Sequence, residues 1–145
     1  MFFRRYQMNK KVVGVAAIII KENRVLALRR NYGKFKGFYE FVGGKIETGE
    51  SDTEALKREV QEEIGITLYD IAYYDTLHHP YDTFELELRM YTAKPGNEEI
   101  VLRVHDDLLW VSSDQLYSVN WIEADIQLLP KLTKFLEFHK ESQVS

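Results

Sequence analysis

The sequence predicts an α+β or αβα fold, in which helices lie on a mixed sheet, and three observations support this class. An apolar, β-branched run at 12–20 is followed by a turn and a second strand-like run at 25–30. The segment 83–91 alternates apolar and polar residues, as a half-exposed strand does. Two further segments, 52–64 and the part after residue 128, repeat apolar residues at helical spacing.

Four segments are predicted to be strands. VVGVAAIII at 12–20 indicates a buried strand, and the turn KENR joins it to VLALRR as a hairpin. TFELELRMY at 83–91 and LLWV at 108–111 indicate two more strands.

The first helix is predicted from Asp52 to Ile64. Ser51 and Glu54 have the spacing of a capping box, which places the helix start directly after ETGE. Gly65 is typical of a helix end. One apolar stripe of this helix should pack on the sheet: Leu56, Val60 and Ile64.

The second helix is predicted near the C-terminus, where Leu129, Leu132 and Leu136 recur at helical spacing. Pro130 lacks an amide hydrogen and is tolerated in a first turn, so the helix should begin close to it. No repeat or low-complexity linker divides the chain. We therefore expect a single domain over 1–145, with a basic N-terminal extension at 1–11.

Composition narrows the classes of function. The longest apolar run has nine residues, against roughly 20 needed to span a bilayer. No signal-peptide pattern follows the basic N-terminus, so a cytoplasmic protein is expected. The absence of cysteine excludes disulfides, thiolate nucleophiles and zinc–thiolate sites. A formal net charge of −4 does not suit a protein that grips long nucleic acid, so a small ligand is the better expectation.

Seven acidic residues crowd the stretch 44–65, and Glu59, Glu62 and Glu63 fall on one arc of the predicted helix. Like charges at this spacing repel by about 0.2–0.5 kcal/mol per pair, and no lysine or arginine lies on that arc. A solvated acidic face is one interpretation. The other is a site for Mg²⁺ or Mn²⁺, which bind carboxylates and complete their shells with water and substrate phosphate.

Gly43 and Gly44 follow a strand-like run directly before this helix. They would let a backbone group approach a ligand closely, although an ordinary turn also explains them. The combination with the helix is more specific, because nine fixed positions of the Nudix box are present within 23 residues: Gly44, Glu50, Arg58, Glu59, Val60, Glu62, Glu63, Gly65 and Ile66. The chain therefore resembles the Nudix hydrolases.

This resemblance implies the Nudix αβα sandwich, with a mixed sheet and flanking helices, and hydrolysis of a nucleoside diphosphate linked to another group. The residues that match the family's metal site are Glu59, Glu62, Glu63 and the carbonyl group of Gly43. Those that match its catalytic group are Glu59, Glu62 and Arg58, and the structural positions are Gly44, Glu50 and Gly65. Metal would offset phosphate charge and activate a water molecule, and a glutamate would accept the proton.

The likeness extends beyond the box. GFYEFVGGKIETGE is similar to a run of the MutT-like nucleoside triphosphate pyrophosphohydrolases, and HDDLLWVSSDQL and NWIEADIQLLPKL are similar to segments of their CTP pyrophosphohydrolase branch. The aspartate in that branch's base pocket matches Asp125, for which helix capping is the alternative.

Two positions depart from the family pattern. Val104 stands where the family commonly has a glutamate, so either Asp106 or Asp107 reaches the metal or the box glutamates suffice. Val42 stands where many MutT-like members have proline.

Several other side chains are candidates for substrate binding. Arg30 and Lys45 could meet phosphate, with solvated surface as an equal alternative. Five aromatic residues could stack on a base or pack in the core: Phe35, Phe38, Tyr39, Phe41 and Tyr81. Three histidines match no common metal motif and are expected in loops or near substrate: His78, His79 and His105.

The leading hypothesis is metal-dependent hydrolysis of a nucleoside triphosphate to monophosphate and pyrophosphate, with water attacking the β-phosphorus. The expected substrate is an oxidised or otherwise modified deoxynucleotide, or a cytidine nucleotide. Alternatives are an enzyme that cleaves ADP-ribose, a dinucleoside polyphosphate or capped RNA, the last disfavoured by the acidic charge, and a Nudix module that only binds a nucleotide. We expect a monomer or homodimer without a membrane or long nucleic acid partner.

Overall fold

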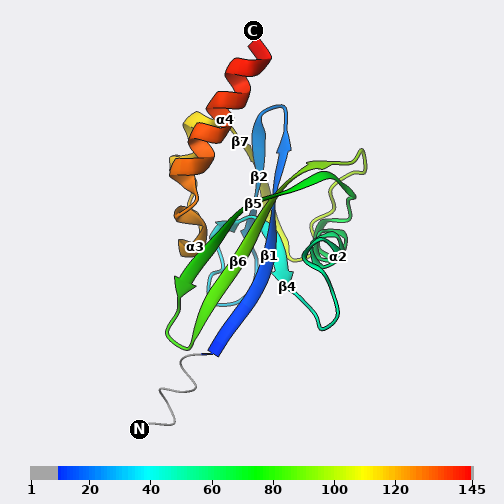
Figure 1. Ribbon diagram of the computed structural model, residues 1–145, viewed down its shortest axis with the longest axis vertical. Helices are drawn as coiled ribbons and strands as arrows, with labels where there is room; N and C mark the ends of the chain where they lie inside the picture. Colours follow the sequence, from blue (N-terminus) through cyan, green and yellow to red (C-terminus); the bar gives the residue numbers. More distant parts are fainter. Residues whose placement is uncertain (1–9, 145) are drawn as a thin grey trace.

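The computed structural model describes residues 10–144, with side chains described through Lys140. Its elements are, in chain order, β1 (Lys10–Lys21), β2 (Arg24–Arg30), β3 (Tyr39–Glu40), β4 (Val42–Lys45), α2 (Asp52–Ile64), β5 (Leu68–Pro80), β6 (Phe84–Pro95), β7 (His105–Val111), the 3-10 helix η1 (Ser113–Ser118), α3 (Glu123–Ile126) and α4 (Leu129–Val144). The strands form a central layer between α2 on one side and α3 and α4 on the other (Figure 1). The predicted αβα arrangement is confirmed.

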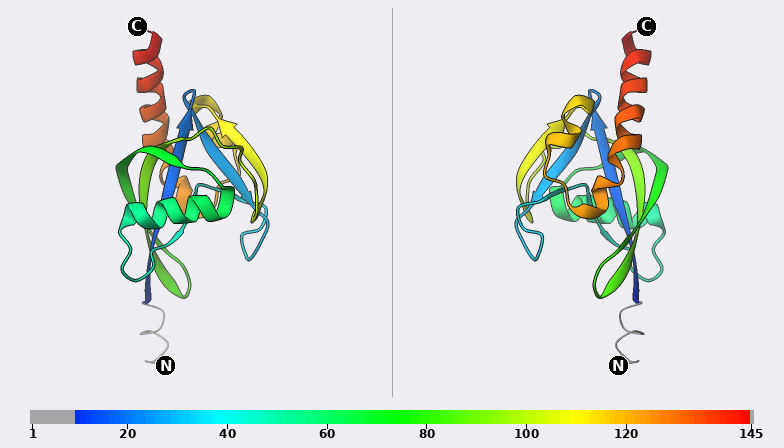
Figure 2. Two further views of the ribbon diagram at one scale, coloured as in Figure 1. Left: turned by 90° about the vertical axis from the view of Figure 1, so that its right-hand side faces the viewer. Right: turned by 90° about the vertical axis from the view of Figure 1, so that its left-hand side faces the viewer.

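β1 runs through the middle of a seven-stranded mixed sheet. Its residues 10–19 pair parallel with β6, residues 14–17 pair antiparallel with β4, and only residues 20–21 pair with β2. β5 is the outer neighbour of β6, and β3 and β7 flank β2. The sheet therefore opens into two wings, with α2 across one face and α4 on the opposite face (Figure 2).

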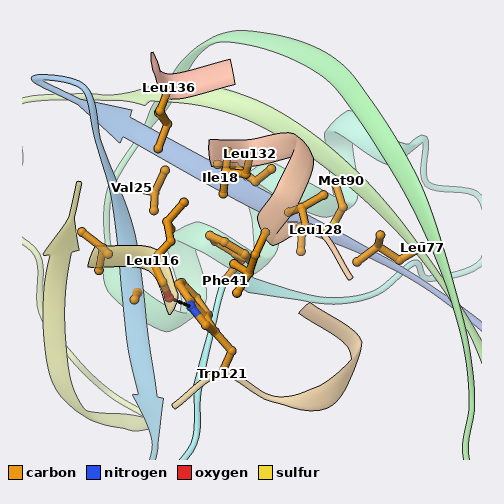
Figure 3. Close-up of a cluster of buried hydrophobic side chains, with 14 residues drawn as sticks. Ile18, Val25, Phe41, Leu77, Met90, Leu116, Trp121, Leu128, Leu132 and Leu136 are labelled. Carbon is orange, nitrogen blue, oxygen red and sulfur yellow. Dashed lines mark hydrogen bonds between the residues drawn. The ribbon is translucent and has the colours of Figure 1, made fainter. Parts of the chain in front are cut away.

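Both faces of β1 are covered, which explains why its sequence is apolar at almost every position. Alternate side chains of a strand point to opposite faces. One set packs with the apolar stripe of α2: Val15, Ala17 and Ile19 with Leu56, Val60 and Ile64. The other set packs beneath α4 (Figure 3): Ala16 and Ile18 with Leu128, Leu132 and Leu136. The two cores fix the positions of both helices relative to the sheet.

The first predicted helix begins and ends as the sequence indicates, and the second begins where expected. The Ser51 hydroxyl accepts from the Glu54 amide at 3.2 Å, and the Glu54 carboxylate accepts from the Ser51 amide at 2.9 Å. Gly65 ends α2 with a φ of 72°, a left-handed conformation that suits glycine. Pro130 lies in the first turn of α4.

The strands agree less closely with the sequence pattern. The predicted hairpin is confirmed, with its turn at Glu22 and Asn23. β6 and β7 are both longer than the predicted segments 83–91 and 108–111. The pattern does not predict β5 at all, because bulges interrupt its register and hide the alternation of buried and exposed side chains.

The N-terminal boundary is also different. Lys10 and Lys11, expected in the basic extension, are paired residues of β1. The rest of that expected extension, residues 1–9, lies outside the described residues. Between residues 10 and 144, no helix is both long and apolar enough to span a bilayer.

Candidate active site

The helix that carries the box glutamates is tied to its surroundings at both ends. Near its start, Asp52 accepts hydrogen bonds from Arg89 at 2.9 Å and from the Tyr91 hydroxyl at 2.6 Å, both on β6. Near its end, Arg103 donates to two carbonyl oxygens of the last turn at 2.9 Å. These are acceptors that a helix C-terminus otherwise leaves free. These contacts fix both ends of α2 relative to the rest of the fold.

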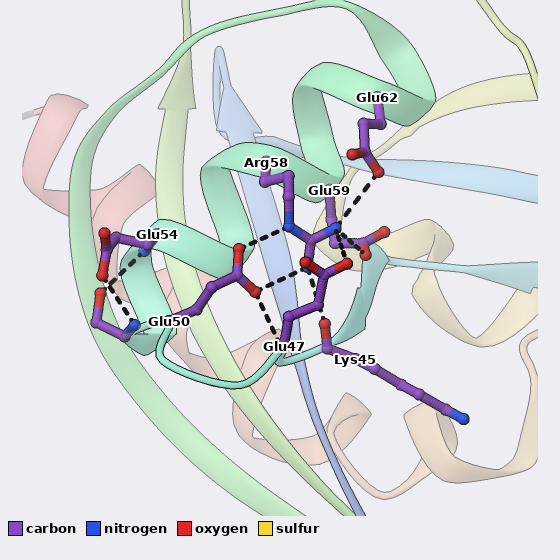
Figure 4. Close-up of polar contacts among 8 residues, drawn as sticks. Lys45, Glu47, Glu50, Glu54, Arg58, Glu59 and Glu62 are labelled. Atoms are coloured by element: carbon purple, nitrogen blue, oxygen red, sulfur yellow. Dashed lines mark hydrogen bonds and ion pairs between the residues drawn. The ribbon is translucent and has the colours of Figure 1, made fainter.

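Arg58 is the centre of the polar contacts on this helix (Figure 4). Its Nε and Nη2 donate to the two Glu50 oxygens at 2.6 and 2.9 Å, and Nη2 also donates to the Lys45 carbonyl at 3.1 Å. Its Nη1 donates to Glu59 at 2.8 Å and to Glu62 at 3.4 Å. Arg58 lies outside the acidic arc, as the sequence indicates, but its long side chain reaches Glu59 and Glu62 from the adjoining position.

The charges in this network reinforce one another. Hydrogen bonds to Glu50 and then Glu59 raise the pKa of Arg58. The Arg58 guanidinium, followed by the Glu47 amide, lowers the pKa of Glu50 to about 2. Both side chains are therefore charged throughout the neutral pH range, and the bidentate pair between them fixes the loop before α2 to the helix.

The two glycines of β4 permit two close approaches. A Cβ atom on Gly44 would lie 2.4 Å from the Glu59 carboxylate carbon, so the missing side chain leaves room for that carboxylate. A Cβ atom on Gly43 would lie 2.0 Å from the Val15 carbonyl oxygen of β1. Both residues belong to a strand and not to a turn, and the preceding Val42 is buried under α2.

Glu63 has a buried carboxylate oxygen, Oε2, without a hydrogen-bond partner among the described residues. Burial raises the pKa of this carboxyl well above its ordinary value, and the adjacent Glu59 and then Glu40 raise it further. The side chain of Glu62, in contrast, is 60% exposed. The negative charge around Glu63 is thus only partly offset by protein groups.

These glutamates are not a ready-made metal site. Within the part of the chain that the structure describes, no three acidic or histidine side chains are close enough to hold a metal ion. The exposed Glu62 would have to turn toward Glu59 and Glu63 to complete one. The donor types nevertheless fit a hard divalent cation, since the unpaired Glu63 oxygen is a buried acceptor that such an ion would satisfy.

A cavity of about 250 Å³ extends from β4 to α3. Its wall includes all five substrate-binding residues predicted from the sequence, together with two glycines of β4: Arg30, Lys45, Phe41, Tyr81, Asp125, Gly43 and Gly44. The remaining lining is mainly apolar and comes from β1, the loop after β2, β3, β6 and the region of α3. Residues that are far apart in the sequence therefore meet in a single pocket.

Asp125 is the most deeply buried acidic residue of that wall, with 2% of its surface exposed. Its Oδ2 accepts from the Phe41 amide at 3.3 Å. Burial, and then the nearby Glu40, raises the pKa of Asp125 to about 8. The capping alternative is wrong, because Asp125 lies inside α3 and its side chain bonds to the strand region instead of a helix amide.

Three of the five aromatic candidates lie on the cavity wall: Phe35, Phe41 and Tyr81. Phe35 and Tyr81 come from different loops, and their ring centroids are 5.7 Å apart. Phe38 packs edge-on against Phe35, and the Tyr39 hydroxyl donates to a carboxylate of β7. These last two side chains are not part of the wall, which corrects their assignment as stacking candidates.

Asp106 and Asp107, the two carboxylates close to Val104, have other partners in this structure. Val104 is exposed. Asp106 accepts from Arg29 at 2.7 Å, and Asp107 accepts from Tyr39. Both carboxylates are therefore engaged by side chains outside the glutamate cluster.

The three candidate histidines, His78, His79 and His105, lie on strands. His78 is exposed on β5. His79, on the same strand, lies 3.2 Å from Glu123 and 3.0 Å from Gln127, so it links β5 to the α3 region. His105 is the first residue of β7, and its Nε2 lies 2.9 Å from Glu40.

Glu40 is the polar residue of the cavity wall that sequence reasoning missed. Its carboxylate is bonded by side chains of two neighbouring strands, Arg30 of β2 and His105 of β7. The only signal in the sequence is an acidic residue between aromatic residues in YEF, at a position where a strand alone would favour an apolar side chain.

Comparison with known proteins covers nearly the whole described chain. The NUDIX domain model matches residues 10–136. The chain is 31% identical over 128 residues to the 8-oxo-dGTP diphosphatase of Haemophilus influenzae, covering 86% of this chain and 94% of that protein. It is 31% identical over 121 residues to the CTP pyrophosphohydrolase of Escherichia coli, covering 83% of this chain and 90% of that protein. The solution structure of the E. coli ORF135 protein is similar with a TM-score of 0.75 and 28% identity, covering 84% of this chain and 88% of that one.

Proposed function

Because the chain belongs to the Nudix family and is a hydrolase of phosphoric anhydrides in nucleotides, we propose that it cleaves a nucleoside or deoxynucleoside triphosphate to the monophosphate and pyrophosphate. The observation that carries this proposal is the continuity of the cavity. One end holds the buried carboxyl of Asp125, and the other reaches Gly44 and Lys45 beside the box helix. A nucleotide whose base lies next to Asp125 would place its phosphates near Gly44 and Lys45.

The glutamates of α2 are assigned to a divalent cation, Mg²⁺ with Mn²⁺ as a substitute. The proposed ligands are Glu59, Glu62, Glu63 and the Gly43 carbonyl. When bound, such a cation would offset phosphate charge and lower the pKa of a water molecule. Arg58 supports the assignment because it already fixes Glu50 and Glu59 while leaving Oε2 of Glu63 unpaired.

The reaction we assign is a displacement at the β-phosphorus. The water oxygen forms a bond to the β-phosphorus. The bond between the β-phosphorus and the oxygen shared with the α-phosphate breaks, and the monophosphate leaves with the electron pair. A glutamate of the same helix, Glu59 or Glu62, accepts the water proton. Arg30 and Lys45 hold the phosphates as charged donors. Phe35 and Tyr81 enclose the base between the two loops.

The base is read by Asp125. A neutral carboxyl donates one hydrogen bond and accepts another, which matches the N3 and amino groups of cytosine, whereas an ionised carboxylate only accepts, which matches the two donors of guanine or 8-oxoguanine. The raised pKa of Asp125 favours the neutral form at pH 7. A cytidine nucleotide is therefore the first candidate, and an oxidised or otherwise modified deoxynucleotide the second.

A nucleotide panel tests the proposed function. The full chain is incubated with dCTP, CTP, dGTP, 8-oxo-dGTP, ADP-ribose or a dinucleoside tetraphosphate, with Mg²⁺, Mn²⁺ or EDTA, and the products are separated by chromatography. We expect monophosphate and pyrophosphate from a triphosphate, and none with EDTA. Diphosphate with inorganic phosphate, activity in EDTA, or cleavage of only the last two compounds would contradict the proposal.

The expected partners and location are part of the same proposal. A small nucleotide that fills the cavity requires neither long nucleic acid nor a membrane surface. We propose a cytoplasmic monomer or homodimer, which sedimentation of the purified chain and fractionation of cells test directly.

A further inference from the structure

His105 is a buried histidine with one satisfied and one unsatisfied nitrogen. Its side chain is 0% exposed, and Nε2 lies 2.9 Å from the Glu40 carboxylate. Nδ1 is buried and has no hydrogen-bond partner among the described residues. A buried polar atom without a partner lowers stability, so packing alone would favour an apolar side chain here. The histidine is therefore explained by the carboxylate that it binds.

Glu40 joins three strands at the cavity wall. Its Oε1 accepts from Arg30 Nε of β2 at 2.9 Å. Its Oε2 accepts from His105 Nε2 of β7, and the Tyr32 hydroxyl lies 3.4 Å from the same oxygen. The carboxylate side chain is only 12% exposed. With its oxygens occupied in this way, Glu40 is a fixed acceptor and not a spare metal ligand.

Arg30 is the residue that this arrangement orients. The Glu40 contact uses only Nε, while the guanidinium lies 4.9 Å from the Tyr32 ring centroid. Arg30 lines the same cavity as Asp125 and Lys45, so its guanidinium can reach a nucleotide bound there. The two Nη groups form the forked edge that recognises phosphate oxygens.

We propose that His105 is a positioning residue for substrate phosphate. It holds Glu40, and Glu40 holds the Arg30 guanidinium with its forked edge toward the phosphate next to the nucleoside. This inference rests on the proposed function, since it concerns the same cavity. His105 itself does not touch the substrate.

The test replaces His105 by Leu, with His78→Leu as the matched change at an exposed histidine of β5. Three quantities are measured in the full chain: KM and kcat for dCTP and 8-oxo-dGTP with Mg²⁺, the Kd of dCMP in EDTA by calorimetry, and the melting temperature. We expect H105L to raise KM and Kd about tenfold, as loss of one charge-assisted contact does. kcat should fall by no more than about threefold, and the melting temperature should fall, because the buried Glu40 carboxylate loses a donor.

Two further variants separate positioning from a general structural effect. His105→Gln retains a side-chain N–H donor and should recover most of the lost affinity. In an Arg30→Leu protein, which already lacks the forked edge, His105→Leu should add no further increase in the Kd of dCMP. An additive increase, or a lower melting temperature with unchanged KM and Kd, would overturn the inference.

The two proposals fail in different ways. A wild-type protein that hydrolyses no triphosphate and does not bind dCMP would overturn the proposed function and this inference together. A wild-type protein that is active, with H105L matching it and H78L in KM and Kd, would overturn only the role of His105.

Discussion

The two ends of the proposed site are built in opposite ways. At the α2 end, the contacts of Arg58 with Glu50, Glu59, Glu62 and the Lys45 carbonyl span at most 13 residues of chain. At the α3 end, the contact of Asp125 with Phe41 spans 84 residues. One helix and the loop before it therefore build the proposed reaction centre, while the packing of distant segments builds the proposed base pocket.

The carboxylates at the two ends also differ in how deeply they are buried. The carboxylates of α2 are partly accessible, so removing one of their charges leaves the two hydrophobic cores intact. Asp125 is buried in α3 and accepts from the Phe41 amide, so we expect a change there to affect both folding and substrate choice. We expect substitutions of the α2 carboxylates to act on turnover alone, and substitutions of Asp125 to act on stability and selectivity together.

The largest effect should come from neutralising one glutamate of α2. Glu62→Gln or Glu63→Gln should lower kcat roughly a thousandfold for every nucleotide, because metal catalysis supplies several kcal/mol. The melting temperature should change little, since neither carboxylate belongs to a core. Glu99→Gln, the same change at an exposed position, is the control. Turnover near the wild-type level in either variant would remove these residues from the reaction centre.

Alanine substitutions at the two adjacent glycines of β4 should have different effects, one mainly on activity and the other mainly on stability. Gly44→Ala displaces only the end of the Glu59 side chain, so we expect about a hundredfold loss of kcat/KM with a folded protein. Gly43→Ala meets the backbone of β1, so its main effect should be a lower melting temperature. Kinetics and thermal melts of both variants check this. If Gly44→Ala retained full activity, the position of the Glu59 carboxylate would be irrelevant to catalysis.

Arg58→Lys should have a smaller effect at the same end. Lysine keeps the charge but cannot bond Glu50 bidentately while also reaching Glu59, so kcat/KM should fall about tenfold or more. Arg24→Lys, at an exposed position of β2, should leave the rate unchanged. Equal rates for the two variants would reduce Arg58 to a charge that any cation can supply.

The smallest expected effect is a pH dependence of stability that is due to Asp125. The pKa of Asp125 is raised to about 8 in the folded protein, against about 3.9 in an unfolded chain. Between these values the folded state binds the extra proton, so the stability that this residue contributes is lost as pH rises toward 8. Asp125→Asn stays neutral at every pH.

The difference in melting temperature, Asp125→Asn minus wild type, should therefore increase from pH 5 to pH 8 by roughly 3 °C or more. The neighbouring Glu40, Arg30, Tyr81 and Glu123 are present in both proteins, so the two proteins differ only in the group at position 125. A difference that is constant over this pH range would mean that Asp125 is ionised in the fold.

The sequence predicts local features far better than distant ones. The limits of α2, its capping box and its left-handed Gly65 follow from residues within one or two turns, and all are confirmed. β5 is missed because its bulges remove the period on which strand prediction depends. Glu40 is missed because only the pairing of β2 with both β3 and β7 brings Arg30 and His105 to it. No local pattern encodes that contact.

The same reasoning applies to single side chains. An arc on a helical projection places Cα positions but ignores the length of Arg58, which reaches glutamates on the adjoining arc. Asp125 resembles a helix cap in sequence because aspartate is favoured there. Its actual partner, the Phe41 amide, becomes visible only when the two segments pack.

We propose that Asp125 chooses the base while the glutamates of α2 perform the reaction, a claim that the ranking of substrates tests. kcat/KM is determined for dCTP, CTP, dGTP and 8-oxo-dGTP with the wild type, Asp125→Ala and Asp125→Asn. We predict that Asp125→Ala changes the ranking of the four substrates, and that Asp125→Asn, which can still donate and accept, keeps a ranking closer to the wild type. Rates that fall by the same factor for all four substrates in Asp125→Ala would contradict the claim.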